Sequence, residues 1–190
     1  MKIAKNDGFT IVEIAVVIVV IGILAGLVYT FIVPHSTSRT YYIRSMAEFN
    51  TMANANSLYV AKYNDYPPDV SRDIPAGMKE FIQGQYANNA WPAAPYPGSV
   101  YDYENWPPDG NGPEQTYQIS IRMCSPGDDA TCKDNAKKWL SDYVPAATLD
   151  AWDSYSAMYY CIKGSCRSHQ TKPISYPGFC VNCGGKSNVF

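Results

Sequence analysis

Near its N-terminus the chain contains one long apolar stretch that holds a single acid. Residues 9–33 include no Lys, Arg, Asp or His, and Glu13 is their only carboxylate. Because an α-helix needs about 20 apolar residues to cross the hydrocarbon core of a bilayer, this pattern predicts a membrane-spanning helix. A lone carboxylate in such a helix costs roughly 2.5–3.5 kcal/mol on insertion scales, so we expect Glu13 to gain a partner at its working position.

The residues around Glu13 resemble a known processing signal. Lys2 and Lys5 lie in a short leader that ends at Gly8, and Phe9 follows. Residues 10–13 then run from Thr to Glu into a span rich in Val and Ile. This pattern resembles the class III signal of type IV pilins and of the pseudopilins of type II secretion. The resemblance implies that a prepilin peptidase cuts after Gly8 and methylates the amino group of Phe9, the new N-terminal residue.

A secretory signal peptide and a plain membrane anchor fit the apolar stretch less well. A signal peptide has an apolar core of about 7–15 residues followed by a small-residue cleavage site, whereas this stretch is longer and meets Pro34. A plain membrane anchor fits the length but leaves Glu13 without a role. By the positive-inside rule, Lys2 and Lys5 keep the leader in the cytoplasm, so we expect the residues after Val33 on the other side of the membrane.

The helix is expected to continue beyond the membrane as an amphipathic segment over residues 34–63. Gly22 and Gly26 weaken a helix and Pro34 removes one of its hydrogen bonds, so we expect a kink or unwound stretch between Gly22 and Pro34. The resemblance to pilins implies that this region melts on assembly. Further along, apolar residues recur at three- and four-residue steps and predict one stripe that packs under a sheet: Tyr42, Met46, Phe49, Ala53, Val60 and Tyr63. Prolines 67 and 68 end the helix.

The rest of the chain predicts an α+β domain. Residues 117–123 alternate apolar and polar side chains and predict a strand that covers the helix stripe. Residues 69–112 predict a long connection with a brief helix near its start, residues 134–140 a short helix, and residues 157–162 with 165–170 a hairpin. The resemblance implies a pilin-like fold, in which a long N-terminal helix packs against a small antiparallel β-sheet with a disulfide-braced C-terminal region. The expected parts are a cleaved leader (1–8), a transmembrane or filament-core helix (9–33), its amphipathic continuation (34–63) and an extracytoplasmic globular domain (64–190).

All six cysteines lie in the last 67 residues. Their even number and the expected extracytoplasmic location predict disulfides. The sequence alone does not choose the connectivity, but the spacing favours three local loops: Cys124 to Cys132, Cys161 to Cys166, and Cys180 to Cys183. The spacing Cys161-x4-Cys166 followed by Cys180-x2-Cys183 also resembles a four-cysteine zinc ribbon, which is the less favoured alternative outside the cytoplasm.

The sequence offers little for catalysis or cofactor binding. It has no glycine-rich phosphate loop, HExxH or GxSxG motif, and neither His35 nor His169 stands beside a nucleophile in a known motif, so we expect no enzymatic activity and no cofactor. Asp109, Asp128 and Asp129 are weak calcium candidates, but solvated turns are favoured at these positions and no metal is expected. The net charge of −2 gives no strong attraction to nucleic acid or anionic lipid.

Together these features predict a structural subunit of a type IV pilus filament. Its expected partners are identical subunits in a helical homopolymer, the prepilin peptidase, the assembly platform with its ATPase, and the membrane before assembly. The precursor is expected in the cytoplasmic membrane and the assembled subunit in an extracellular filament, where Glu13 pairs with the Phe9 amino group of a neighbouring subunit. The alternatives are a type II secretion pseudopilin, favoured by a proven calcium site, and a minor pilin in adhesion or DNA uptake. The last needs a basic or aromatic patch, for which the loose candidates are Arg122, Lys133, Lys137 and Lys138.

Overall fold

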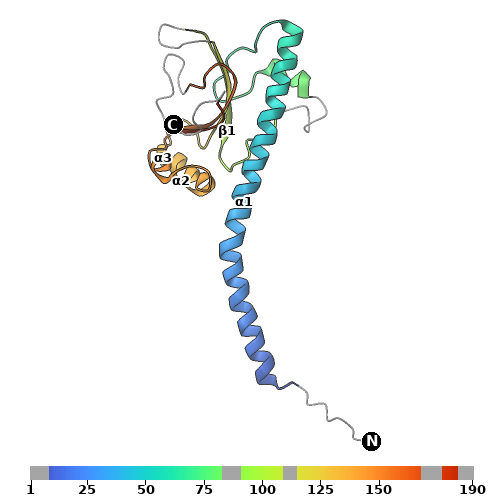
Figure 1. Cartoon of the computed structure of the whole chain (residues 1–190), viewed down its shortest axis with the longest axis vertical. Helices are drawn as coiled ribbons and strands as arrows, with labels where there is room; N and C mark the ends of the chain where they lie inside the picture. The colour runs from blue at the N-terminus through green and yellow to red at the C-terminus, as the bar shows by residue number, and fades with distance from the viewer. Residues whose placement is uncertain (1–8, 83–90, 109–114, 168–176, 184–190) are drawn as a thin grey trace, which may run out of the picture. The chain divides into compact units, whose positions relative to one another are not determined.

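The computed structural model of the chain describes residues 9–82, 91–108, 115–167 and 177–183, and over residues 30–36 it describes the backbone alone (Figure 1). By internal contacts the chain divides into two compact units, Met1–Thr40 and Tyr41–Phe190. Its elements are, in chain order, helix α1 (Ile11–Tyr63), the 3-10 helix η1 (Ala76–Ile82), strands β1 (Val100–Trp106) and β2 (Thr116–Arg122), helices α2 (Asp129–Leu140) and α3 (Ala146–Asp150), and strands β3 (Ala157–Lys163) and β4 (Gly178–Asn182).

The first unit consists of the N-terminal part of α1. Over Ile11–Tyr29, 19 residues, the helix is long and apolar enough to cross a membrane, and none of these residues is buried. The helical backbone runs without interruption through Gly22, Gly26 and Pro34. The predicted melting of this region on assembly stays a prediction, since the described chain is a single subunit.

In the second unit, α1 buries a face that differs from the predicted stripe. Phe49 is fully buried, as predicted, but Met52 and Ala55, which were not in the stripe, are buried beside it. Tyr63, predicted at the end of the stripe, is 49% exposed. Tyr42 and Met46 pack against the same core, so the first half of the stripe is confirmed and only its continuation toward Tyr63 was wrong. Apolar spacing alone misplaces the face because it also carries three buried polar residues: Ser45, Glu48 and Asn56.

Helix α1 ends at Tyr63 through a residue in the left-handed conformation. Asn64 has a φ of 55°, a region that Asn tolerates better than most residues. Its N–H donates to the carbonyl of Val60 at 2.8 Å, which satisfies one carbonyl of the last turn. Prolines 67 and 68 follow and cannot continue the helix. The chain then turns back toward the sheet.

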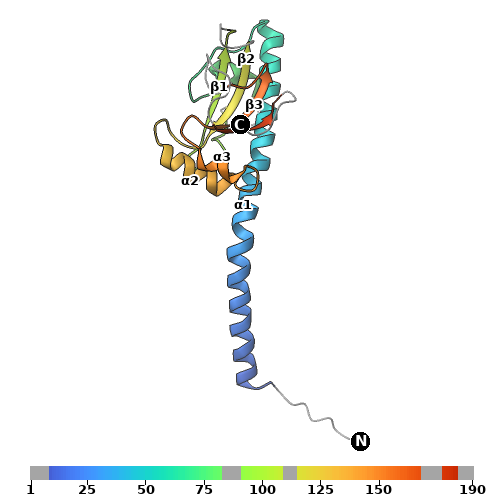
Figure 2. The same ribbon diagram turned by 60° about the vertical axis from the view of Figure 1, so that its left-hand side comes forward.

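The four strands form one sheet in the order β1-β2-β3-β4, of which Figure 2 labels the first three. β1 pairs with β2 and β2 with β3 in antiparallel fashion, whereas β3 and β4 are parallel. The predicted α+β fold is confirmed, but the expectation of a wholly antiparallel sheet was wrong. So was the hairpin over residues 157–170, because the two edges of β3 pair with β2 and β4 and the described residues 165–167 form no strand, while residues 168–170 lie outside the described chain. The connection between Lys163 and Gly178 has the length that a parallel pair requires.

Strand β1 lies in the segment that was predicted as a connection. Its side chains alternate, with Tyr101 and Tyr103 on one face and Asp102 and Glu104 on the other. The strand was missed because prolines at 97, 107 and 108 flank it and predicted only short regular structure. Both of its carboxylates are buried. The predicted strand is confirmed as β2, the brief helix as the 3-10 helix η1, and the short helix as α2, which begins earlier than expected, at Asp129.

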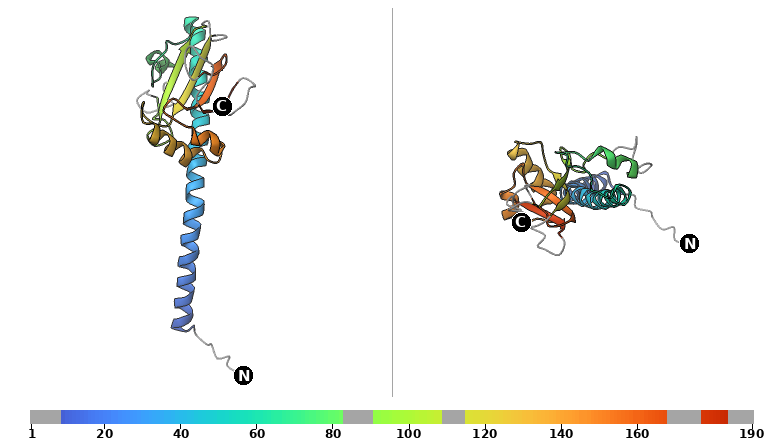
Figure 3. Two further views of the ribbon diagram at one scale, coloured as in Figure 1. Left: turned by 90° about the vertical axis from the view of Figure 1, so that its left-hand side faces the viewer. Right: turned by 90° about the horizontal axis from the view of Figure 1, so that it is seen from above.

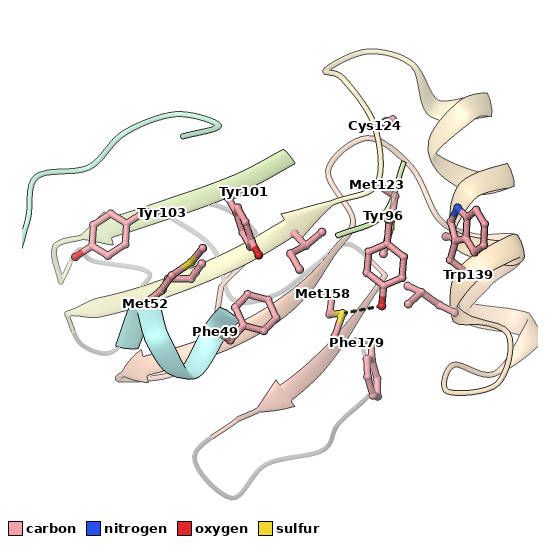
Figure 4. Packing of buried hydrophobic residues seen from close by; sticks show 14 of the residues in the cluster. Phe49, Met52, Tyr96, Tyr101, Tyr103, Met123, Cys124, Trp139, Met158 and Phe179 are labelled. Atoms are coloured by element: carbon pink, nitrogen blue, oxygen red, sulfur yellow. Dashed lines mark hydrogen bonds between the residues drawn. The ribbon is translucent and has the colours of Figure 1, made fainter. Parts of the chain in front are cut away.

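The hydrophobic core lies between α1 and one face of the sheet. Phe49 and Met52 of α1 point toward Tyr101 and Tyr103 of β1 (Figure 4). At the other end of the core, the Tyr96 hydroxyl lies 3.8 Å from the sulfur of Met158. Helices α2 and α3 lie together at one end of the sheet (Figures 2 and 3). They extend the same core with Trp139, Leu140, Leu149 and Trp152.

Candidate assembly site and cysteine-rich region

The N-terminal site is a reciprocal cap at the first turn of α1. The backbone N–H and the side-chain hydroxyl of Thr10 both donate to Glu13 Oε2, each at 2.8 Å. In return, the N–H of Glu13 donates to Thr10 Oγ1 at 3.3 Å. Thr10 immediately precedes the helix and Glu13 is the third residue of the helix, so this arrangement is a capping box. It gives hydrogen-bond acceptors to two backbone N–H groups, those of Thr10 and Glu13, which the start of a helix otherwise leaves without partners. Sequence reasoning singled out Glu13 and missed Thr10 as its partner.

The surface around this cap is apolar and uncovered. Side chains of residues 9–29 are exposed throughout, and Phe9 at their start is 86% exposed. A soluble monomer rarely exposes an apolar surface of this extent, so the helix needs lipid or other protein chains around it. Glu13 and Thr10 are thus polar groups on a helix whose surroundings exclude water.

The same segment carries the family assignment. The prokaryotic N-terminal methylation motif, a known family profile, matches residues 3–29. The match supports a protein of the type IV pilin or prepilin type. The motif implies processing by a prepilin peptidase and assembly with other subunits, and the apolar helix fits a membrane-anchored precursor. Comparisons with curated proteins and with solved structures gave no match. The α+β arrangement of a long N-terminal helix, a small sheet and C-terminal disulfides is pilin-like.

The other predicted residues of the N-terminal site are less fully described. Gly8, at the predicted cleavage point, lies outside the described residues. A Cβ added at Gly22 or Gly26 would meet nothing within 4 Å in the single chain. Packing within the subunit therefore gives no reason for glycine at these two positions. The side chains of Pro34 and His35 lie outside the described part of the chain, as does His169.

The six cysteines form the three local pairs that the spacing favoured. Cys124 binds Cys132, Cys161 binds Cys166, and Cys180 binds Cys183. The first pair joins the end of β2 to the first turn of α2. The other four cysteines lie together in a second buried cluster, separate from the main core. Each of these pairs closes a short loop, so none of the three links β3 directly to β4.

Two of the three calcium candidates have other roles. Asp128 caps α2 by accepting the N–H of Thr131 at 3.1 Å, and Asp129 accepts the N–H of Ser154 at 2.9 Å. Hydrogen bonding to Ser154 also lowers the pKa of Asp129. Asp128 therefore caps a helix, and Asp129 joins the start of α2 to Ser154. Asp109 lies outside the described residues.

The outer face of the sheet holds a buried ionic cluster that the sequence did not reveal. Arg122 binds Asp102 through Nε at 3.0 Å and Glu104 through Nη2 at 2.7 Å. All three side chains are buried, so Arg122 is no part of an exposed basic patch. Burial raises the pKa of Glu104 from its usual 4.5 to about 8, against the attraction of Arg122. One guanidinium thus faces two carboxylates away from water.

A second buried arginine ties the segment after β3 to this face. The N–H of Arg167 donates to the side-chain carbonyl of Gln118 at 2.7 Å, and its Nε donates to Thr116 Oγ1 at 2.9 Å. Its Nη2 donates to the carbonyl of Trp106 at 3.1 Å. These bonds run to β1 and β2, so this segment lies over the sheet and does not pair with β3 as a hairpin strand would.

Proposed function

We propose that this chain is a structural subunit of a type IV pilus, held in the membrane as a precursor and polymerised into a filament through its N-terminal helix. Cleavage after Gly8 creates a charged, methylated amino group on Phe9. In the filament, that group pairs with the Glu13 carboxylate of a neighbouring subunit. Because the same contact repeats at every subunit, it sets the register of a helical homopolymer. The role is structural and not catalytic.

The observation that carries this proposal is that, among the residues the structure describes, Glu13 meets only the neutral donors of Thr10 and no cation. Thr10 gives Glu13 two hydrogen bonds from neutral donors, which reduce the cost of placing the carboxylate in lipid. Neutral donors do not cancel the charge, and in a medium of low dielectric an opposite charge is favoured far more strongly than in water. A cation from a second copy of the same exposed helix would supply it. A subunit could then leave the bilayer without stranding a charge.

The test compares Glu13→Gln with Glu13→Val in cells that assemble the filament. Glutamine keeps the size of Glu13 and an acceptor for Thr10 but removes the charge, whereas valine removes both. We expect both variants to be processed and to stay in the membrane, with filament yield sharply reduced in both. The measurement is the intact mass and amount of the chain in sheared filaments and in membranes. Normal filament yield from Glu13→Gln would contradict the charge pairing.

Two further results decide the wider proposal. The wild-type chain in sheared filaments should begin at methylated Phe9, and its mass should rise on reduction as three disulfides open. Gly8→Val should retain residues 1–8 and stay out of filaments, because Phe9 then has no free amino group. If the processed wild-type chain is found in membranes but never in filaments, the pilus role is wrong even if the charge pairing holds.

A further inference from the structure

Two disulfides lie side by side in the second buried cluster. One joins Cys161 of β3 to Cys166, and the other joins Cys180 of β4 to Cys183. The Sγ atoms of Cys161 and Cys180, which belong to different disulfides, are 3.9 Å apart, close to van der Waals contact. The Sγ atom of Cys166 lies within 4.8 Å of both. A sulfur of each disulfide is therefore placed to react with the other disulfide.

The two cysteines in closest contact are the less exposed members of their pairs. Cys161 is 5% exposed against 8% for Cys166, and Cys180 is 0% exposed against 7% for Cys183. An external thiolate opens a disulfide by attacking one sulfur and releasing the other as a thiolate. Attack at Cys166 or Cys183, the outer cysteine of either pair, therefore releases an inner cysteine, Cys161 or Cys180, beside the disulfide that is still closed.

We propose that these two disulfides form a redox switch, in which a dithiol reductant converts them to a single Cys161–Cys180 disulfide and leaves Cys166 and Cys183 as thiols. One thiolate of the dithiol attacks Cys183, forms a mixed disulfide with it and releases the Cys180 thiolate. Cys180 then attacks Cys161 and releases Cys166. The second thiol of the dithiol attacks the mixed disulfide and releases Cys183.

The exchange is balanced and does not depend on which pair opens first. Two electrons and two protons pass from the dithiol to the chain, and the dithiol leaves as a disulfide. If the reductant attacks Cys166 first, the released Cys161 thiolate attacks Cys180 and displaces Cys183. The same inner disulfide and the same two outer thiols result.

The surroundings of the sulfurs support this product. The side chain of Asn182 donates to the carbonyl of Cys161 at 3.0 Å, which holds β4 to β3 beside the two inner cysteines. The sulfur of Cys183 lies 3.4 Å from the carbonyl oxygen of Cys180, so the thiol that is left there has a hydrogen-bond acceptor.

The exchange changes which elements are covalently joined. Each present disulfide closes a loop beside its own strand, whereas the Cys161–Cys180 bond joins β3 to β4, the last strand of the sheet order. Cys161 and Cys180 are 19 positions apart, against 5 and 3 for the present pairs, and a longer closed loop restricts the unfolded chain more strongly. The switch thus keeps β4 attached to the domain when the local disulfides are reduced.

The test treats the full oxidised chain in detergent micelles with a substoichiometric amount of dithiothreitol, then with acid and a thiol-alkylating reagent. Peptide mass mapping should find Cys166 and Cys183 alkylated in the same chain, with Cys161 joined to Cys180. The third disulfide lies outside the cluster and is the internal control, because it should open only as a pair. Alkylation of both members of one original pair, with the other pair intact, would overturn the proposal. Resistance of all four cysteines in the folded chain would do the same.

Matched variants test the contact between the inner cysteines. Cys166→Ser with Cys183→Ser keeps only the inner cysteines of the cluster and should form the Cys161–Cys180 disulfide on mild oxidation. Cys161→Ser with Cys180→Ser keeps only the outer cysteines and should form their disulfide about tenfold more slowly. Both variants lose the same two bonds, so a general loss of folding affects them alike. Equal oxidation rates, or no disulfide in the first variant, would count against the switch.

Discussion

Thr10 and Glu13 satisfy each other's polar groups at the first turn of α1. Two donors of Thr10 meet one carboxylate oxygen of Glu13 at 2.8 Å, and the N–H of Glu13 returns to the Thr10 hydroxyl. This contact lies within one chain and therefore exists before assembly. It gives the carboxylate hydrogen-bond partners within its own chain, and it fixes where the helix starts relative to the proposed cleavage point after Gly8.

Thr10→Val tests this cap. Valine keeps the shape and the backbone N–H but removes the hydroxyl, which donates to Glu13 and accepts its N–H. We expect the first turn of α1 to lose about 0.5–2 kcal/mol of local stability. The measurement is amide hydrogen exchange at Glu13 and Ile14 in detergent micelles, with Thr10→Ser, which keeps the hydroxyl, as the control. Equal exchange in all three chains would show that the hydroxyl does not hold the turn.

The N-terminal site was largely predictable because its signal is local. One acid in 25 apolar residues stands out in the sequence, and the preceding glycine and aromatic residue give it context. The partner Thr10 could also have been found, since Thr followed three residues later by Glu is the capping-box pattern. Disulfide pairing was predictable for the same reason: each pair is close in sequence.

The core of the domain gives a second prediction. Met52 is fully buried on α1, whereas Leu58 on the same helix is 53% exposed. Met52→Ala should lower the free energy of unfolding by about 2–5 kcal/mol, because it leaves a cavity between α1 and the sheet. Leu58→Ala should change it by less than about 0.5 kcal/mol. Denaturant unfolding of the full chain in micelles, followed by tryptophan fluorescence, measures both. A similar loss in the two variants would contradict the assignment of the buried face.

The outer face of the sheet shows where sequence reasoning reached its limit. Asp102 and Glu104 alternate with Tyr101 and Tyr103, a pattern that normally indicates one solvated face. The carboxylates are buried because Arg122 of β2 forms ion pairs with both of them and the segment with Arg167 crosses above. Both arginines are distant in sequence from the acids that they help to bury. No local sequence pattern could have predicted that these arginines cover this face of the sheet, or that β4 pairs with β3 in parallel.

Gly178 at the start of β4 gives a third prediction. A Cβ at this position would lie 2.5 Å from a ring carbon of Tyr159 and 3.1 Å from the carbonyl oxygen of Ala157. Because Tyr159 is fully buried, its ring has no free space to move into. Gly178→Ala should therefore destabilise the domain by about 1–3 kcal/mol. The control is the same substitution at Gly22, where nothing lies within 4 Å. Equal unfolding midpoints for Gly178→Ala and wild type would show that β4 shifts without cost.

The buried Glu104 makes a fourth prediction, on pH dependence. Its pKa is raised by burial from 4.5 in the unfolded chain to about 8 in the folded domain. Between these values the folded state binds more protons than the unfolded state, so stability falls as the pH rises. The contribution of protonated Glu104 to the free energy of unfolding is fully present below about pH 4.5 and is lost by the time the pH passes about 8.

Glu104→Gln should reduce the loss of folding stability as the pH rises, because glutamine keeps an acceptor for Arg122 and does not titrate. The measurement is the free energy of unfolding of both chains from pH 5 to pH 9. Glu80→Gln is the control: hydrogen bonds from Lys62 and Tyr63 lower the pKa of this exposed carboxyl, so its contribution is lost only as the pH falls toward the acid range. Between pH 5 and 9, Glu80→Gln should therefore follow the wild-type slope. If Glu104→Gln follows it as well, Glu104 is ionised throughout and its pairing with Arg122 outweighs the effect of burial.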